Sequence, residues 1–165
     1  MTPLLTGWGR TAPTAATLVE TSAGDVPALL RERPPRGLIA RGLGRSYGDA
    51  AQNAGGTVLL PVQGPTSVAR DGDRALVTAA AGTSLHELMA TLLAQGLFVP
   101  VTPGTRYVSV GGAVAADIHG KNHHREGSFA QHVVSLDLVT ADGTVRTIGP
   151  TADPDLFWAT AGAWG

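Results

Sequence analysis

The sequence predicts an α+β fold in a single domain of 165 residues. Short apolar runs recur along the chain, only one segment has a strong amphipathic helix pattern, and 22 glycines and 11 prolines fall between these runs. The apolar content of 43% is enough for a hydrophobic core. We therefore expect short strands joined by loops, with few helices.

The N-terminal part contains one weak helix and three strands. A short helix is expected over residues 25–33, because two prolines follow it directly. Strands are expected at residues 37–40 and 57–62, on either side of the glycine-rich segment RGLGRSYG (41–48). Residues 75–79 form a further predicted strand.

The clearest helix begins at Ser84 and ends at Gly96. Ser84 and Glu87 have the spacing of a capping box, in which each residue satisfies an amide of the other. The apolar residues at helical spacing are Leu85, Leu88, Met89 and Leu92. This stripe predicts one buried face, with His86 at the surface.

Three further elements are expected in the C-terminal part. Residues 97–101 are predicted as a buried strand that Pro100 bends or places at an edge. Residues 133–140 and 144–148 flank Ala-Asp-Gly, which predicts a hairpin. A last helix is expected to be capped by Asp153 and to run through Trp158.

Composition excludes several classes of function. The net charge of −1, the scattered basic residues and the aromatic content of 5% do not fit a nucleic-acid-binding surface. No cysteine is present, which excludes disulfides and thiolate metal sites. We find no signal peptide and no apolar run long enough for a transmembrane helix, so we expect a cytoplasmic or membrane-associated protein.

The segment RGLGRSYG resembles a dinucleotide fingerprint only superficially. Its spacing is GxGxxxG, and the residues after it do not form an amphipathic helix, so a Rossmann site is not expected. Consecutive backbone N–H groups in such a loop can still bind an anion, with Arg41 or Arg45 balancing the charge. A tight turn with solvated arginines is the alternative.

A second glycine-rich segment is PGTRYVSVGGAVAADIHGKNHH (103–124). Its glycines let the backbone approach a ligand closely. His119, Lys121, His123 and His124 raise the question of a metal site. We expect no metal, because Gly111, Gly112 and Gly120 make a helix costly here and no carboxylate pair completes a ligand set.

The two glycine segments lie about sixty residues apart, each at a predicted strand end. Together they suit one extended ligand with phosphates in the middle and a flat ring at one end. A dinucleotide such as FAD has this shape.

Several segments carry a resemblance to a known family. They are ARGLGRSYGDAAQN (40–53), residues 103–124, SFAQHVVSLDLVTADG (128–143), TGWGR (6–10) and DLFWAT (155–160). These segments resemble the FAD-binding half of the decaprenylphosphoryl-ribose 2′-oxidases, within the vanillyl-alcohol-oxidase superfamily. The resemblance implies a PCMH-type FAD-binding domain over residues 1–165, with two small α/β subdomains that grip the flavin. The substrate-binding domain is expected beyond residue 165.

The resemblance also implies roles for individual residues. Contacts to FAD are implied for Arg41, Gly42, Leu43, Gly44, Arg45, Ser46, Tyr47, Pro103, Gly104, Thr105, Gly111, Gly112, Ala115, Ala116, Ile118 and His119. His119 and Lys121, with Tyr47 close by, are implied as catalytic groups that orient or polarise the substrate. Many superfamily members attach FAD to a histidine where this chain has Arg45, so we expect non-covalent FAD.

By the same resemblance, the reaction oxidises the 2′-hydroxyl of a lipid-linked sugar phosphate, decaprenylphosphoryl-ribose, to a 2′-keto sugar. This is the first step of an epimerisation that a separate NADH-dependent reductase completes. The lipid substrate is compatible with peripheral membrane association. Two alternatives remain open at this point: a non-catalytic flavin-binding module, and a related FAD-linked sugar or alditol oxidase.

Overall fold

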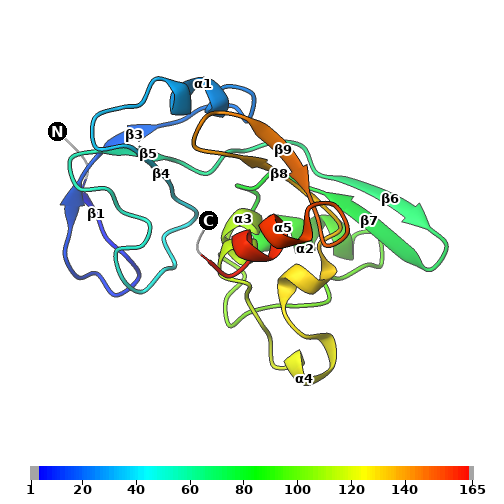
Figure 1. Ribbon diagram of the computed structural model, residues 1–165. Coiled ribbons are helices and arrows are strands. Elements are labelled where there is room, and N and C mark those ends of the chain that lie inside the picture. The colour runs from blue at the N-terminus through cyan, green and yellow to red at the C-terminus, as the bar shows by residue number, and fades with distance from the viewer. Residues whose placement is uncertain (1–3, 164–165) are drawn as a thin grey trace.

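The computed structural model describes residues 4–163, which form a mixed fold of short strands and short helices (Figure 1). The strands are β1 (Leu4–Leu5), β2 (Thr14–Ala15), β3 (Thr17–Val19), β4 (Leu38–Ala40), β5 (Thr57–Leu59), β6 (Ser67–Asp71), β7 (Arg74–Thr78), β8 (Leu136–Val139) and β9 (Val145–Ile148). The helices are α1 (Val26–Arg31), α2 (Leu85–Leu93), α3 (Val110–Ala115), α4 (His123–Glu126), α5 (Pro154–Thr160) and the 3₁₀ turn η1 (Phe129–His132). The prediction of an α+β fold is confirmed at this level.

A three-stranded parallel sheet organises the N-terminal part, in the order β3-β5-β4. Val19, Leu59 and Ala40 are in register, so the carboxyl ends of all three strands lie at one edge. Val58 and Leu59 of the central strand are buried. The strand predicted at 37–40 corresponds to β4. Of the strand predicted at 57–62, only the first half forms a strand, β5. Strand β3, which is only three residues long, was not predicted.

Two antiparallel hairpins belong to the C-terminal part. The pair β8–β9 confirms the hairpin predicted around Ala-Asp-Gly, although its first strand begins at Leu136 rather than at residue 133, which is the C-cap of η1 and whose amide bonds to the Ala130 carbonyl at 3.1 Å. The predicted strand at 75–79 is β7, and its partner β6 was missed. The sequence of β6, SVARD, offers too few apolar residues to be recognised without its partner.

Helix α2 has the predicted capping box. The Ser84 hydroxyl accepts a hydrogen bond from the Glu87 amide at 3.1 Å, and the Glu87 carboxylate accepts one from the Ser84 amide at 3.0 Å. The buried stripe is also confirmed, and it joins the main core, whose buried members are Leu85, Leu88, Leu92, Val99, Val101, Ala113, Val114 and Phe129.

The strand predicted at 97–101 is wrong. Val99 and Val101 are buried as expected, but the segment forms no strand ladder. Pro100 lacks the amide that a ladder needs, and the Leu97 amide bonds instead to the Leu92 carbonyl at 3.0 Å. Burial of alternate residues is therefore achieved by an irregular segment that covers α2.

The predicted helices at both ends of the chain are α1 and α5. Asp153 occupies the N-cap position of α5, but its side chain makes no cap hydrogen bond, so that part of the prediction is wrong. Its backbone is left-handed, with φ +61°, and its carboxylate pairs with Arg146. Phe157 is fully buried in a smaller core with Ala130 and Ile148.

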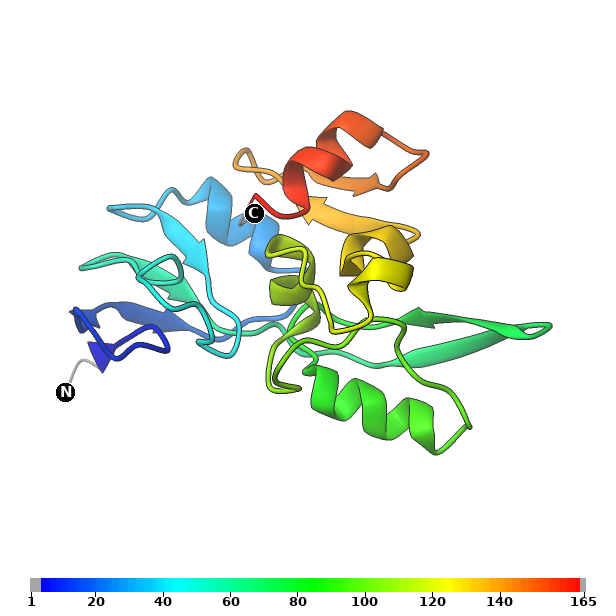
Figure 2. The same ribbon diagram turned by 90° about the horizontal axis from the view of Figure 1, so that it is seen from below.

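The elements form two groups in space. Strands β1–β5 and α1 lie on one side, and β6–β9 with α2, α4 and α5 lie on the other, with α3 facing the first group (Figures 1 and 2). Between residues 4 and 163 no helix has the length and apolarity required to span a bilayer.

Candidate cofactor-binding site

The first glycine segment is a loop, Arg41–Gly48, at the carboxyl end of β4. As predicted, no helix follows it. Gly44 has φ +68°, a backbone conformation that favours glycine. Within residues 4–163, the seven consecutive N–H groups from Gly42 to Gly48 donate to no protein acceptor.

These free amides point to a ligand. Residues 41–46 are half-buried, and Tyr47 and Gly48 are exposed, so a ligand can reach these amides. An anion such as a phosphate accepts several such amides at once. The free amides are compatible with the anion-binding loop that the glycine spacing predicts, and this role stays a prediction.

Arg41 adds a positive charge beneath this loop. Its guanidinium donates to the Thr6 carbonyl at 2.7 Å and to the Ala51 carbonyl at 3.0 Å. A side chain at Gly44 would run into it. Partial burial lowers the pKa of Arg41, yet an arginine stays protonated at neutral pH. Over the described part of the chain, the only ion pair is Arg146–Asp153, so no carboxylate neutralises Arg41.

The two predicted segments meet at Gly42. A Cβ atom on Gly42 would overlap the hydroxyl of Ser109, and it would lie 3.5 Å from the Ser109 Cβ atom. Ser109 caps α3 and accepts a hydrogen bond from the Gly112 amide at 3.2 Å. Glycine at position 42 therefore lets the first loop lie directly against the start of the second segment.

The structure corrects the prediction for Gly111 and Gly112. We expected loop backbone here and considered a helix costly, but both glycines belong to α3. Tertiary contacts offset the weak helix propensity, because the Val110 and Gly111 amides bond to the Thr83 and Ala81 carbonyls, each at 2.8 Å. A Cβ atom on Gly111 would lie 3.1 Å from that of Ala81, so a small residue permits this close packing.

The start of α3 is not a site for a phosphate. The amides of Val110, Gly111 and Gly112 already have protein acceptors, so the start of α3 offers none of them to a ligand. The Arg41–Gly48 loop remains the element with free amides. Ala115 lies in the last turn of α3, Ala116 follows it directly, and Ile118 packs partly against the main core.

His119 and Lys121 follow α3 and are exposed. A Cβ atom on Gly120 would lie 2.6 Å from the Thr102 carbonyl, and the Asn122 side chain donates to the Pro100 carbonyl at 3.0 Å. This segment therefore runs beside the loop that contains Pro103, Gly104 and Thr105.

The imidazoles of His119 and His123 are neighbours, with ring centroids 5.5 Å apart. Residues 4–163 hold no group of three or more His, Cys, Asp or Glu side chains that could ligate a metal ion. Tyr47 belongs to the first loop, with 80% of its surface exposed. Among the residues described, no hydrogen bond joins Tyr47 to His119 or Lys121.

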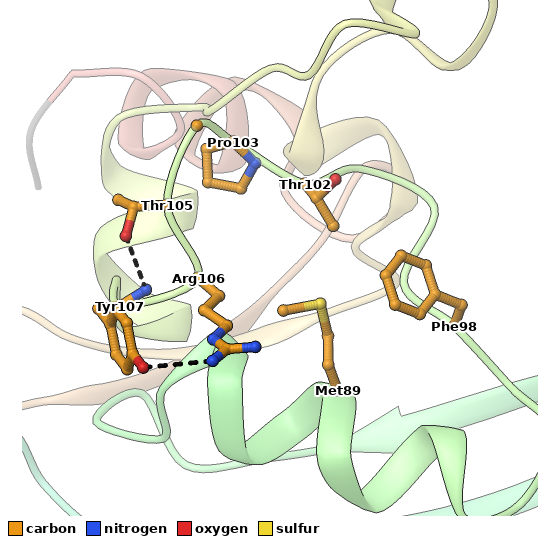
Figure 3. A pocket seen from close by; sticks show the side chains of 8 residues that line it. Met89, Phe98, Thr102, Pro103, Thr105, Arg106 and Tyr107 are labelled. Carbon is orange, nitrogen blue, oxygen red and sulfur yellow. Dashed lines mark hydrogen bonds between the residues drawn. The ribbon is translucent and has the colours of Figure 1, made fainter.

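Two hollows flank these elements. One, of about 440 Å³, lies between α2 and residues 102–107 (Figure 3). Its lining includes Pro103, Gly104 and Thr105, but Met89 and Phe98 place it on the α2 side of that loop. The other, of about 580 Å³, is lined by Glu20, Thr21, Leu60, Pro61 and Gln63. This second hollow lies at the carboxyl edge of the parallel sheet, where the Arg41–Gly48 loop also begins, and ligands of parallel sheets commonly bind at that edge.

Two features of the site were not recognised from the sequence. Ser109 was not predicted to cap α3, although its hydroxyl accepts a hydrogen bond from the Gly112 amide three residues later. Segment Thr6–Arg10 also contacts the first loop: the Trp8 amide donates to the Ser46 carbonyl at 2.7 Å, and the Arg45 guanidinium lies 4.7 Å from the Trp8 ring centroid. No local pattern in the sequence indicates that contact.

Comparison with known proteins identifies the ligand class. Residues 14–149 match the family described as FAD binding domain. The chain belongs to this FAD-binding domain family. Its cofactor is FAD, and the free amides and unneutralised Arg41 fit a phosphate-bearing dinucleotide.

Three relatives extend this assignment. The chain is 54% identical to decaprenylphosphoryl-beta-D-ribose oxidase of Mycolicibacterium smegmatis over 170 residues, which cover 99% of the chain and 37% of that protein. It is 25% identical to D-lactate dehydrogenase of Archaeoglobus fulgidus over 142 residues, 85% of the chain and 32% of that protein. It is 29% identical to cytokinin dehydrogenase 4 of Arabidopsis thaliana over 133 residues, 78% of the chain and 25% of that protein. The chain thus spans between 25% and 37% of the length of these relatives.

Proposed function

We propose that this chain is the FAD-binding part of an oxidase that converts decaprenylphosphoryl-ribose to its 2′-keto sugar. The observation that carries the proposal is the row of free amides from Gly42 to Gly48 in a chain 54% identical to an oxidase of that name. D-lactate and cytokinin dehydrogenases are more distant in sequence, at 25% and 29% identity. The ribose substrate is therefore favoured over theirs.

The proposed placement of the cofactor follows from the free amides. The FAD pyrophosphate lies against Gly42–Gly48, above the Arg41 guanidinium. Pro103, Gly104 and Thr105, with the exposed side of α3 and the segment after it, line the remaining length of the cofactor. The two groups of elements in Figure 2 act as the two small subdomains that hold it.

The cofactor is held without a covalent bond in this proposal. The loop Arg41–Gly48 contains neither histidine nor cysteine, and the whole chain has no cysteine. Covalent attachment at the position of Arg45 is therefore excluded by its side-chain chemistry, because a guanidinium is a poor nucleophile at neutral pH.

When bound, FAD supplies the acceptor for the hydride that leaves the 2′-carbon of the sugar. We assign His119 and Lys121 to the substrate side, where they orient the sugar. An exposed imidazole nitrogen can accept the 2′-hydroxyl proton. The Lys121 ammonium stabilises negative charge that develops on the 2′-oxygen. Tyr47, exposed on the first loop, forms the opposite wall.

The rest of the catalytic machinery belongs to a substrate-binding domain outside these residues, in keeping with the 37% coverage of the ribose oxidase. A separate NADH-dependent reductase is the proposed consumer of the keto sugar. The lipid tail of the substrate makes peripheral membrane association part of the same proposal.

The test is to purify the full-length oxidase, with its substrate-binding domain, and to record its visible spectrum before and after adding lipid-linked ribose without oxygen. We expect a yellow protein whose flavin absorption is bleached by this substrate, and whose FAD is released intact on denaturation. A folded but colourless protein would contradict the cofactor assignment. A yellow protein that alditols or D-lactate bleach, and the lipid-linked ribose does not, would contradict the substrate assignment.

A further inference from the structure

The segment Thr6–Arg10, which we call the brace, lies against the cofactor loop. In both ribbon views the Arg41–Gly48 loop runs between the brace and α3 (Figures 1 and 2). Gly7 is buried, and a Cβ atom there would overlap the Gly48 carbonyl and lie 2.8 Å from the Ser46 carbonyl oxygen. Only glycine allows this approach.

Two amides of the brace, and one arginine that contacts the brace, donate hydrogen bonds to carbonyl groups of the loop. The Trp8 amide donates to the Ser46 carbonyl at 2.7 Å, and the Gly9 amide donates to the Tyr47 carbonyl at 3.4 Å. The Arg45 guanidinium, stacked on the Trp8 ring, donates to the Leu43 carbonyl at 2.9 Å. Three carbonyls of one loop are thus bound by donors that include or contact the brace.

The bound carbonyls fix the direction of the amides that belong to the same peptide units. All peptide bonds in the described residues are trans, and in a planar trans unit the C=O and N–H groups point in opposite directions. The amides that share peptide units with the bound carbonyls are those of Gly44, Tyr47 and Gly48. They are directed away from the donors, and none of them has a protein acceptor within residues 4–163.

Arg41 connects the same parts from below. It donates to the Thr6 carbonyl, at the start of the brace, while lying directly beneath Gly44. The brace is therefore tied to the loop at both its first residue and its tryptophan. Its contacts lie on the carbonyl side, which a ligand of the amides does not touch.

We propose that the brace is a positioning segment for the FAD pyrophosphate, which fixes three loop carbonyls so that the Gly44, Tyr47 and Gly48 amides face the phosphates. This inference rests on the proposed placement of FAD. The brace itself does not contact the cofactor. Its effect is on the phosphate end of the ligand rather than on the flavin ring.

The experiment compares the binding of FAD with that of riboflavin, which lacks the phosphates and the adenosine, to the full apo chain by calorimetry. Gly7→Ala is expected to raise the dissociation constant for FAD at least tenfold, the effect of losing one charge-assisted hydrogen bond, with the constant for riboflavin changed less than twofold. The ³¹P resonances of bound FAD should also shift in this variant.

A second variant covers the case in which Gly7→Ala does not fold. Trp8 is 53% exposed, so Trp8→Ala should fold, and loss of its stack on Arg45 is expected to weaken FAD two- to fivefold. Trp8→Phe should restore most of that loss, because it keeps an aromatic face. Gly24→Ala is the matched glycine control, since its nearest neighbour to a Cβ atom is the Ser22 hydroxyl at 3.8 Å.

The outcomes separate this inference from the proposed function. Wild-type FAD affinity in Gly7→Ala and Trp8→Ala, or equal losses for FAD and riboflavin with unchanged ³¹P resonances, would overturn the positioning role. If the wild-type chain fails to bind FAD at all, the proposed function fails and this inference falls with it.

Discussion

Contact between the two glycine segments can be tested with Gly42 and Ser109. An alanine methyl at position 42 meets the Ser109 hydroxyl, which must turn away and lose its bond to the Gly112 amide. Loss of a serine N-cap costs about 1 kcal/mol of unfolding free energy, in a range of about 0.5–2. For a domain of this size that corresponds to a fall of about 2–4 °C in the melting temperature.

The double variant tests whether residues 42 and 109 touch each other. Ser109→Ala alone loses the same cap, so it should also cost about 1 kcal/mol. With the hydroxyl gone, an alanine at 42 only makes an ordinary contact of 3.5 Å with the Cβ atom of residue 109. Gly42→Ala with Ser109→Ala should therefore cost about 1 kcal/mol in total rather than about 2.

The assay is denaturant unfolding of the four proteins, alongside Gly24→Ala as a control for the general effect of replacing glycine. That control should be at least as stable as the wild type, because it adds no close contact and restricts the unfolded chain. Additive costs for the Gly42 and Ser109 variants would show that the two residues do not touch. The contact between the two segments would then be refuted.

Three further expectations concern groups around this site. Asp117→Ala should lower the free energy of unfolding by about 1–3 kcal/mol, because the Asp117 carboxylate accepts a hydrogen bond from the amide of the buried residue Ala130 at 2.9 Å. Asp117→Asn keeps an acceptor and tolerates the left-handed backbone, so denaturant midpoints should separate the two variants. Ser84→Ala should lower the free energy of unfolding by about 0.5–2 kcal/mol in the same assay. Hydrogen bonds from Ser84 lower the pKa of Glu87, so the contribution of Glu87 to the free energy of unfolding should be full at a pH above the ordinary carboxyl pKa and be lost as the pH falls through the lowered pKa. Hydrogen bonds from the Thr140 side chain and then the Thr144 amide lower the pKa of Asp142 from 3.8 to about 2. Protection of the β8–β9 turn amides from exchange should therefore be full above the ordinary carboxyl pKa, decline below it and be lost as the pH falls through about 2, and a loss already complete at pH 4 would contradict this.

Local patterns predicted the elements that local chemistry decides. The capping box at Ser84 and the hairpin around Ala-Asp-Gly depend on residues within a few positions of each other, and both are confirmed. The failures have two causes. The strand predicted at 97–101 is prevented locally, because Pro100 lacks a ladder amide and the Leu97 amide bonds to the Leu92 carbonyl. Helix α3 depends on distant residues, because carbonyls of Ala81 and Thr83 bind its first amides.

The candidate site divides in the same way. Glycine spacing and the resemblance to a flavoenzyme family pointed to two candidate ligand-binding segments, and the family match confirms FAD as the cofactor. The individual roles of Tyr47, His119 and Lys121 stay predictions. Neither Ser109 as a cap nor the contact of Thr6–Arg10 with the loop was predicted, since each depends on which segments the fold brings together.

The sequence by itself determined the class of fold and the glycine-rich chemistry of the first loop, because glycine spacing and local capping act over a few residues, and the resemblance of its segments gave FAD as the cofactor. Only the tertiary structure decided which way the loop amides point. Their direction depends on donors more than thirty residues away, such as the Trp8 amide at the Ser46 carbonyl, and no local pattern encodes a contact across that distance.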